Sequence, residues 1–233
     1  MKILVTSAAT RLSEALAASL AASHEVLQTD RTPLSGTGRS FVQSGLGHDP
    51  STNDLVRGVD AIVHSGEADP TASVSDQLDF AMRCTYNLLW AAAEERVPRF
   101  VFLSSLRLMA QYDEDLAVTE RWRTVPSTGA IDLCHHLGEY TCREFAREGK
   151  IDVVCLRLGQ LAFDSDAPPA SADELRIEDA VQAVGRAVTA DLPPDSTSSR
   201  QRWTVLHIQS AVPRARYLTA AAERAIGYKP IGV

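Results

Sequence analysis

The sequence alternates short apolar stretches with longer amphipathic ones, and this pattern constrains the fold most strongly. Each short stretch is almost continuously apolar and rich in β-branched residues, which is typical of strands covered on both faces. We predict strands at 2–6, 25–30, 60–65, 99–105, 151–158 and 203–209. The predicted helices lie at 11–22, 52–57, 73–96, 132–149, 173–190 and 213–227. Such alternation forms a parallel sheet through right-handed crossovers, so the predicted fold class is α/β, a doubly wound parallel sheet.

The length and composition indicate a single domain. A chain of 233 residues, of which 45% are hydrophobic, can bury about three-quarters of its unfolded surface in one core. The Gly-, Ser- and Pro-rich stretches at 33–47, 165–172 and 191–200 are predicted loops, and they are too short to separate two domains. We therefore expect one domain over residues 1–233.

The charge and the cysteines argue against several classes of function. The net charge of -7 argues against binding to nucleic acid. The apolar run at the amino-terminal end is too short for a signal peptide or a membrane span. Four cysteines lie in apolar patterns without metal-ligand spacing, as expected of reduced thiols: Cys84, Cys134, Cys142 and Cys155. We expect a cytoplasmic protein without a metal site that binds neither nucleic acid nor a membrane.

The first predicted strand leads into a turn and a helix, the place where α/β proteins bind the pyrophosphate of a dinucleotide. The turn reads TSAATRLS at 6–13 and contains no glycine. Asp30 closes the second strand, where an acidic residue can bind the hydroxyls of an adenine ribose. A carboxylate there favours NAD over NADP, although the adjacent Arg31 weakens that inference. A polar strand exit explains these two residues equally well.

A series of short segments carries a family signature. They include MKILVT at 1–6, GVDAIVHSGE at 58–67, TYNLLWAAAEERVPRFVFLSS at 85–105, DVVCLRLGQLAF at 152–163 and AIGYKP at 225–230. In this order they resemble segments of the extended short-chain dehydrogenase/reductase superfamily, specifically its NAD-dependent epimerase/dehydratase family. The resemblance covers nearly the whole chain. It implies a Rossmann-like NAD(P)-binding domain in which residues 159–233 contribute a small substrate-side portion.

The family's glycine-rich turn, TGxxGxxG, is changed at every glycine, to Ser7, Thr10 and Ser13. Thr10 is the most serious change, because the second glycine lets the backbone approach the pyrophosphate and a left-handed threonine would cost about 1–2 kcal/mol. We favour the interpretation that the Ser7 and Thr10 hydroxyls cap the helix, although they could instead bind an anion. Gly45 and Ala81 replace two further family contacts.

The resemblance implies a cofactor site on nine residues: Ser7, Thr10, Arg11, Leu12, Asp30, Arg31, His64, Ser65 and Gly66. Because the turn glycines are lost, we expect NAD to bind weakly or not at all.

The family's catalytic YxxxK motif falls on IDLCH, so Ile131 replaces the tyrosine and His135 replaces the lysine. A free phenol has a pKa of about 10 and needs a neighbouring cation to act near neutrality. Tyr140 lies too close to Arg157 to be the family's tyrosine. Ser105 matches the catalytic serine, although a serine pair leaving a buried strand also satisfies backbone groups. His135 is a candidate for binding ribose or acting as a base, and a polar helix position is the alternative.

Two functional hypotheses follow. In the first, the chain has lost hydride transfer and acts by binding a small ligand, a residual nucleotide or a protein partner. In the second, it is an active NAD-dependent oxidoreductase or epimerase on a small substrate, with Ser105, His135 or Tyr112 in altered roles. A nucleotide sugar is not expected as substrate, because the substrate-side segment is short.

We also expect a homodimer through helices 73–96 and 132–149, which commonly form a two-fold interface in this superfamily. Both helices carry more apolar residues than one sheet-facing side needs: Leu78, Met82, Tyr86, Leu89 and Ala93 on the first, and Leu133, Leu137, Tyr140 and Phe145 on the second. The alternative is that one broad apolar face packs all of them against the sheet.

Overall fold

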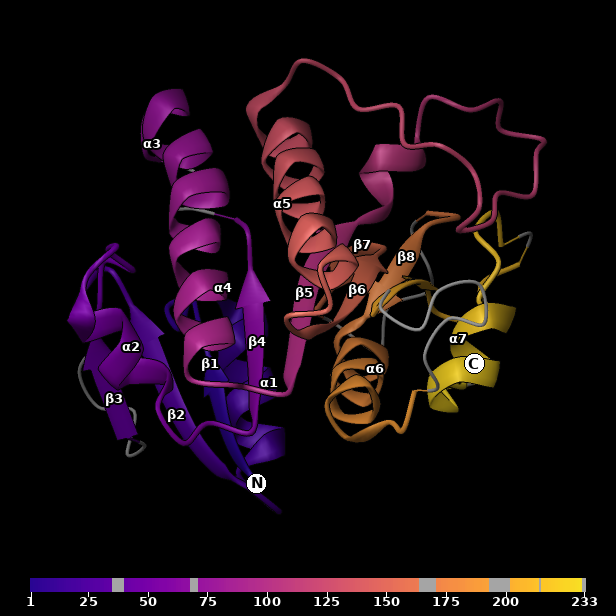
Figure 1. Ribbon diagram of the computed structural model, residues 1–233. Coiled ribbons are helices and arrows are strands. Elements are labelled where there is room, and N and C mark those ends of the chain that lie inside the picture. The colour runs from indigo at the N-terminus through magenta and orange to yellow at the C-terminus, as the bar shows by residue number, and fades with distance from the viewer. Residues whose placement is uncertain (35–39, 68–70, 164–170, 193–201, 214, 232–233) are drawn as a thin grey trace.

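The computed structural model describes the chain except for residues 35–39, 68–70, 164–170, 193–201, 214 and 232–233. A sheet of seven parallel strands in the order β3-β2-β1-β4-β5-β6-β9 forms its centre (Figure 1). The strands are β1 (Lys2–Val5), β2 (Glu25–Asp30), β3 (Ser40–Gln43), β4 (Ala61–Ser65), β5 (Arg99–Ser105), β6 (Asp152–Leu158) and β9 (Trp203–Ile208). The predicted doubly wound parallel sheet is confirmed, and every strand predicted from the sequence is present.

Helices cover both faces of this sheet (Figure 1). One layer contains α2 (Pro50–Val56), α4 (Thr85–Glu94) and α5 (Ala130–Arg147), and the other contains α1 (Arg11–Leu20), α6 (Ile177–Thr189) and α7 (Ala220–Ile226). Side chains alternate between the layers along each strand, so Leu4 packs in one apolar cluster and Ile3 and Val5 in the other. Burial on both faces explains the continuous apolar runs.

The structure adds strands that the sequence pattern did not predict. The predicted loop 33–47 contains the edge strand β3, whose side chains are mostly exposed and therefore lack an apolar run. A separate pair of short strands is formed by β7 (Gln160–Ala162) and β8 (Glu174–Arg176). The other predicted loops, at 165–172 and 191–200, lie largely outside the described residues.

Several predicted helix boundaries were wrong. The predicted helix at 73–96 consists of three consecutive segments: α3 (Val74–Asp79), a π-helical turn (Phe80–Cys84) and α4. The predicted helix at 173–190 begins later, at Ile177, because strand β8 precedes it. The predicted helix at 213–227 begins at Ala220.

The turn between β1 and α1 accommodates the loss of the glycines. Thr10 has an extended backbone (φ -80°, ψ 145°), and its Oγ1 accepts a hydrogen bond from Ser13 N at 3.2 Å. The predicted helix cap is therefore confirmed at Thr10 and wrong at Ser7, whose Oγ has no hydrogen-bond partner among the described residues. The buried Ser13 donates from Oγ to the Thr6 carbonyl at 2.9 Å. The left-handed conformation lies instead at Ser7, with a φ of 51°. The left-handed backbone expected at Thr10 is therefore found at Ser7, and the conformational strain lies there.

The cysteines agree with the expectation of buried thiols. All four cysteines are free and buried. Burial raises the pKa of the Cys142 and Cys155 thiols well above the ordinary value, which leaves them protonated and unreactive. No helix in the described part of the chain combines the length and the apolar character needed to cross a membrane.

The strain at Ser7 gives a stability prediction. We expect Ser7→Gly to raise the free energy of unfolding by about 0.5–1 kcal/mol, because glycine adopts a positive φ without the Cβ clash but loses more chain entropy on folding. Ser7→Ala is the matched control, since it removes the hydroxyl and keeps the strain. Chemical denaturation compares the variants, and a glycine variant no more stable than the alanine variant would contradict the prediction.

Two buried histidines predict acid sensitivity. Burial lowers the pKa of His64 in β4 and of His207 in β9 to about 3. An unfolded histidine has a pKa of about 6.5, so below that pH the unfolded chain binds more protons than the folded one. The free energy of unfolding is therefore unaffected by protonation of these histidines above about pH 6.5. Between about pH 6.5 and pH 3 it decreases as the pH falls, by up to about 1.4 kcal/mol per pH unit for each histidine.

Denaturation curves at about pH 7 and about pH 5 measure this loss. We expect His207→Gln to reduce the dependence of the unfolding free energy on pH over this range. His48→Gln, at an exposed position, should leave it unchanged. Equal stability of the wild-type protein at both pH values would sink the prediction.

Candidate functional site

Two cavities lie along the carboxyl ends of the strands, the edge at which parallel α/β sheets bind ligands. The first has a volume of about 590 Å³ and lies over the ends of β2, β1 and β4. The second has a volume of about 330 Å³ and lies over the ends of β4, β5 and β6. Glu67, which follows β4, lines both cavities. The two cavities therefore meet at this carboxylate.

Asp30, the predicted ribose ligand, lines the first cavity at the end of β2. Its Oδ2 accepts a hydrogen bond from Ala9 N, and its Oδ1 accepts from the backbone N and the hydroxyl of Thr32, all at 3.0 Å. These bonds fix the carboxylate, and a carboxylate has lone pairs for more than three such donors. Arg31 lines the same cavity, with its guanidinium carbon 5.9 Å from the centre of the Phe80 ring.

The other residues of the predicted cofactor site are divided between the cavities and their surroundings. Ser7 and Thr10 line the first cavity, and Leu12 and Ser65 line the second. The guanidinium carbon of Arg11 lies 4.0 Å from the centre of the Phe163 ring. The predicted set is therefore not gathered in one cavity.

His64 and Gly66 belong to the packed interior beside the cavities. The ring nitrogens of His64 lie 2.8 Å from the hydroxyls of Thr6 and Thr85, so both are already engaged. A Cβ on Gly66 would come within 2.9 Å of the Phe102 ring, which explains a glycine at this position by packing. Their contact with a cofactor stays a prediction.

The second cavity brings the predicted catalytic positions together. Ser105 at the end of β5 and both Ile131 and His135 on α5 line it. Ser105 Oγ accepts a hydrogen bond from Arg107 N at 3.2 Å and so caps the short 3-10 helix that follows β5. Tyr112 lies elsewhere, in a small apolar cluster with Trp122.

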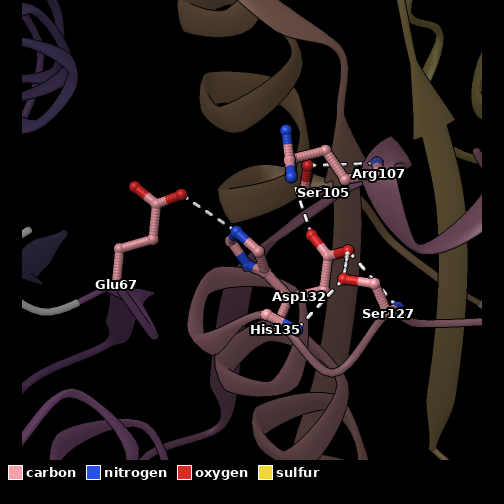
Figure 2. A network of polar contacts seen from close by, with 7 residues as sticks. Glu67, Ser105, Arg107, Ser127, Asp132 and His135 are labelled. Atoms are coloured by element: carbon pink, nitrogen blue, oxygen red, sulfur yellow. Dashed lines mark hydrogen bonds and ion pairs between the residues drawn. The ribbon is translucent and has the colours of Figure 1, made fainter. Parts of the chain in front are cut away.

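A carboxylate–imidazole pair lies where the cavities meet (Figure 2). His135 is 3% exposed, and its Nε2 lies 2.9 Å from Glu67 Oε1. Because an ionised carboxylate only accepts hydrogen bonds, Nε2 donates. This bond lowers the pKa of Glu67, so the carboxylate is ionised near neutral pH. Sequence analysis missed Glu67, although this residue ends the quoted segment GVDAIVHSGE.

The adjacent histidine on α5 points elsewhere, as expected for neighbours on a helix. His136 Nδ1 lies 3.2 Å from the hydroxyl of Thr124, whereas His135 contacts Glu67. Within the described ranges, no group of histidine, cysteine, aspartate or glutamate side chains is placed to hold a metal ion.

A second polar network fixes the start of α5 beside Ser105 (Figure 2). Arg107 Nε donates to Asp132 Oδ1 at 2.9 Å, and Ser127 Oγ donates to Asp132 Oδ2 at 2.6 Å. Burial opposes ionisation of Asp132, but the bonds from Ser127 and Arg107 outweigh it and lower its pKa. Because Asp132 follows Ile131 directly on α5, this network also positions the wall of the second cavity.

A buried ion pair ties α5 to the sheet below the cavity. Arg157 on β6 donates from Nε and Nη2 to the two carboxylate oxygens of Glu139 on α5, both at 2.8 Å. Ser104 on β5 donates to Glu139 Oε1 at 2.7 Å. Side chains of β5 and β6 therefore both bond to one carboxylate on α5, and these bonds hold the helix in position on the sheet.

Known structures with this architecture include several oxidoreductases and an epimerase. Uronate dehydrogenase from Agrobacterium tumefaciens matches with a TM-score of 0.82 at 23% identity, over 99% of this chain and 84% of that chain. Glucuronic acid dehydrogenase from Chromohalobacter salexigens gives 0.82 at 22% identity, over 99% and 84%. UDP-N-acetylglucosamine 4-epimerase from Bacillus cereus gives 0.77 at 17% identity, over 99% and 93%. At these identities the likeness shows a shared fold.

A mutant of the Agrobacterium uronate dehydrogenase was solved as a complex with NAD. The comparison with curated proteins found no match. The family described as "NAD dependent epimerase/dehydratase family" matches residues 3–192. Because this match spans most of the 233 residues, the chain belongs to the NAD-dependent epimerase/dehydratase family.

Proposed function

We propose that this chain has lost the hydride transfer of its family and acts by binding a small ligand at the carboxyl ends of its strands. The observation that carries the proposal is the composition of the second cavity. Ile131 stands at the position of the catalytic tyrosine and has no proton to exchange, and His135 stands at the position of the lysine and is bonded to Glu67. Loss of a positioned acid/base typically costs about 10²–10⁴-fold in rate.

The proposal includes weak or absent binding of NAD. Asp30 suits the ribose hydroxyls of a dinucleotide. The rest of the first cavity suits a pyrophosphate poorly, because Thr10 replaces the second family glycine and Glu67 adds an ionised carboxylate. Two like charges about 4 Å apart repel by about 4 kcal/mol at an effective dielectric constant of about 20. The site as a whole therefore does not fit the dinucleotide well.

The volume of the second cavity supports a small ligand. About 330 Å³ is at the lower end of the range for small-molecule sites. The short substrate-side portion, residues 159–233, is consistent with this limit. A nucleotide sugar is therefore not part of the proposal. The four buried, free cysteines support a reducing location, and we place the protein in the cytoplasm.

A second candidate function is an NAD-dependent oxidoreductase with an altered acid/base group. The Glu67–His135 pair favours it, because an imidazole oriented by a carboxylate is a common general base. Ser105 lines the same cavity and can bond the oxygen of a substrate. Turnover of the nicotinamide distinguishes the two candidates.

We expect no micromolar or tighter binding of NAD by titration calorimetry, and no change in the absorbance of reduced nicotinamide with uronates, sugars or alcohols. The double variant Ile131→Tyr, His135→Lys should remain inactive, because the turn after β1 and Glu67 are unchanged. Turnover by the wild-type protein that Ser105→Ala abolishes would establish the second candidate instead.

The proposal also includes a homodimer through α3, α4 and α5. Leu89 and Phe145 pack inward, as a single apolar face requires. Other apolar side chains on α4, on α5 and on the π-helical turn between α3 and α4 remain between 36% and 44% exposed: Met82, Tyr86, Trp90 and Tyr140. A two-fold axis through this surface would bury it against its own copy.

Light scattering at micromolar concentration should report about twice the chain mass of 25.2 kDa. Tyr140→Glu places a charge in the proposed interface and should shift the protein toward the monomer. Leu116→Glu is the control, because Leu116 is 37% exposed but lies on the loop after β5. A wild-type monomer that persists on concentration would rule the dimer out.

A further inference from the structure

The first cavity has a charge pattern that the proposed function leaves unexplained. Among the described residues that line it, three carry carboxylates, Asp30, Glu67 and Asp76, and one carries a guanidinium, Arg31. A phosphate site instead uses cationic side chains and free backbone N–H groups. We infer that this cavity takes a nucleoside-sized ligand whose 5′ substituent is uncharged or positively charged. This inference rests on the proposed function for the location of the site.

The order of the strands determines how such a ligand lies. Because β2, β1 and β4 are neighbours in the sheet, Asp30, Ser7 and Glu67 follow one another along the cavity. The carboxylate of Asp30 already accepts three hydrogen bonds, so Oδ2 keeps one lone pair that can accept from one hydroxyl of a ribose. A ligand whose sugar is bonded to Asp30 and that extends past the end of β1 places the substituent of that sugar beside Glu67. In a nucleoside, that group is the 5′ substituent.

Glu67 makes this end of the cavity selective for charge. Its side chain is 53% exposed, so the carboxylate is accessible to a ligand. The bond from His135 goes to Oε1 and holds the side chain in place. A nearby cation, Arg107, is paired with Asp132 at 2.9 Å. An ammonium or hydroxyl group on the ligand can donate to Glu67, whereas a phosphate is repelled.

Ser7 supplies an independent indication of a ligand. It lines the cavity and is 7% exposed, and its Oγ has no hydrogen-bond partner among the described residues. A buried hydroxyl without a partner is unfavourable, so a ligand atom that bonds to it is stabilising. Leu46 and Phe80 also line this cavity and supply apolar surface for a flat ring.

A series of ligands that differ only in 5′ charge tests the inference. The probes are 5′-amino-5′-deoxyadenosine, adenosine and AMP, and titration calorimetry on the full chain measures their affinities. We expect the amine to bind at least about tenfold more tightly than AMP, with adenosine between them. Glu67→Gln should weaken the amine and strengthen AMP. Glu14→Gln, which removes a carboxylate from α1 outside the cavity lining, is the control and should leave the order unchanged.

Three outcomes would overturn the inference: AMP binding more tightly than the amine, an order of affinities that Glu67→Gln does not change, or no binding of any probe. Each is distinct from failure of the proposed function, which is decided by nicotinamide turnover in a separate assay. Thermal unfolding of the Glu67→Gln variant checks that it is folded, so that its ligand affinities can be compared with those of the wild-type protein.

Discussion

The buried pair of Glu139 and Arg157 sets the geometry on which the second cavity depends. Removing one partner of such a pair typically costs about 3–5 kcal/mol, because the other charge remains buried without compensation. The pair joins α5 to β6, and Ser104 adds β5 to the same carboxylate. Because α5 also carries His135, any displacement of this helix would separate His135 from Glu67 and alter the boundary between the cavities.

The three departures from the family pattern that the proposed function assumes are physically related. A family lysine is a cation that lowers the pKa of the neighbouring phenol, and with Ile131 there is no phenol for it to act on. An imidazole at position 135 can instead donate to a carboxylate, and Glu67 supplies one. In the proposed function, this region therefore holds an anion in place instead of lowering the pKa of an acid.

The sequence predicted those features that depend on local chemistry or on complete burial. Central strands were recognisable because both faces are covered, whereas the exposed edge strand β3 leaves no apolar run. The cap by Thr10 was predictable, since its donor Ser13 is three residues away. The left-handed backbone of Ser7 was not predictable, because the contacts of the folded turn decide which of its residues adopts a positive φ. The bond between Glu67 and His135 joins positions 68 residues apart, so only the packing of α5 on the sheet determines it.

The position of Glu67 between the cavities has a thermodynamic consequence. A ligand in the second cavity that turns the His135 ring also alters its hydrogen bond to Glu67, whose carboxylate lines the first cavity too. Linkage requires the effect to be reciprocal, so each ligand alters the affinity of the other by the same factor. Communication between the two sites thus needs no movement of a helix or a strand, because both occupants would share one charged side chain.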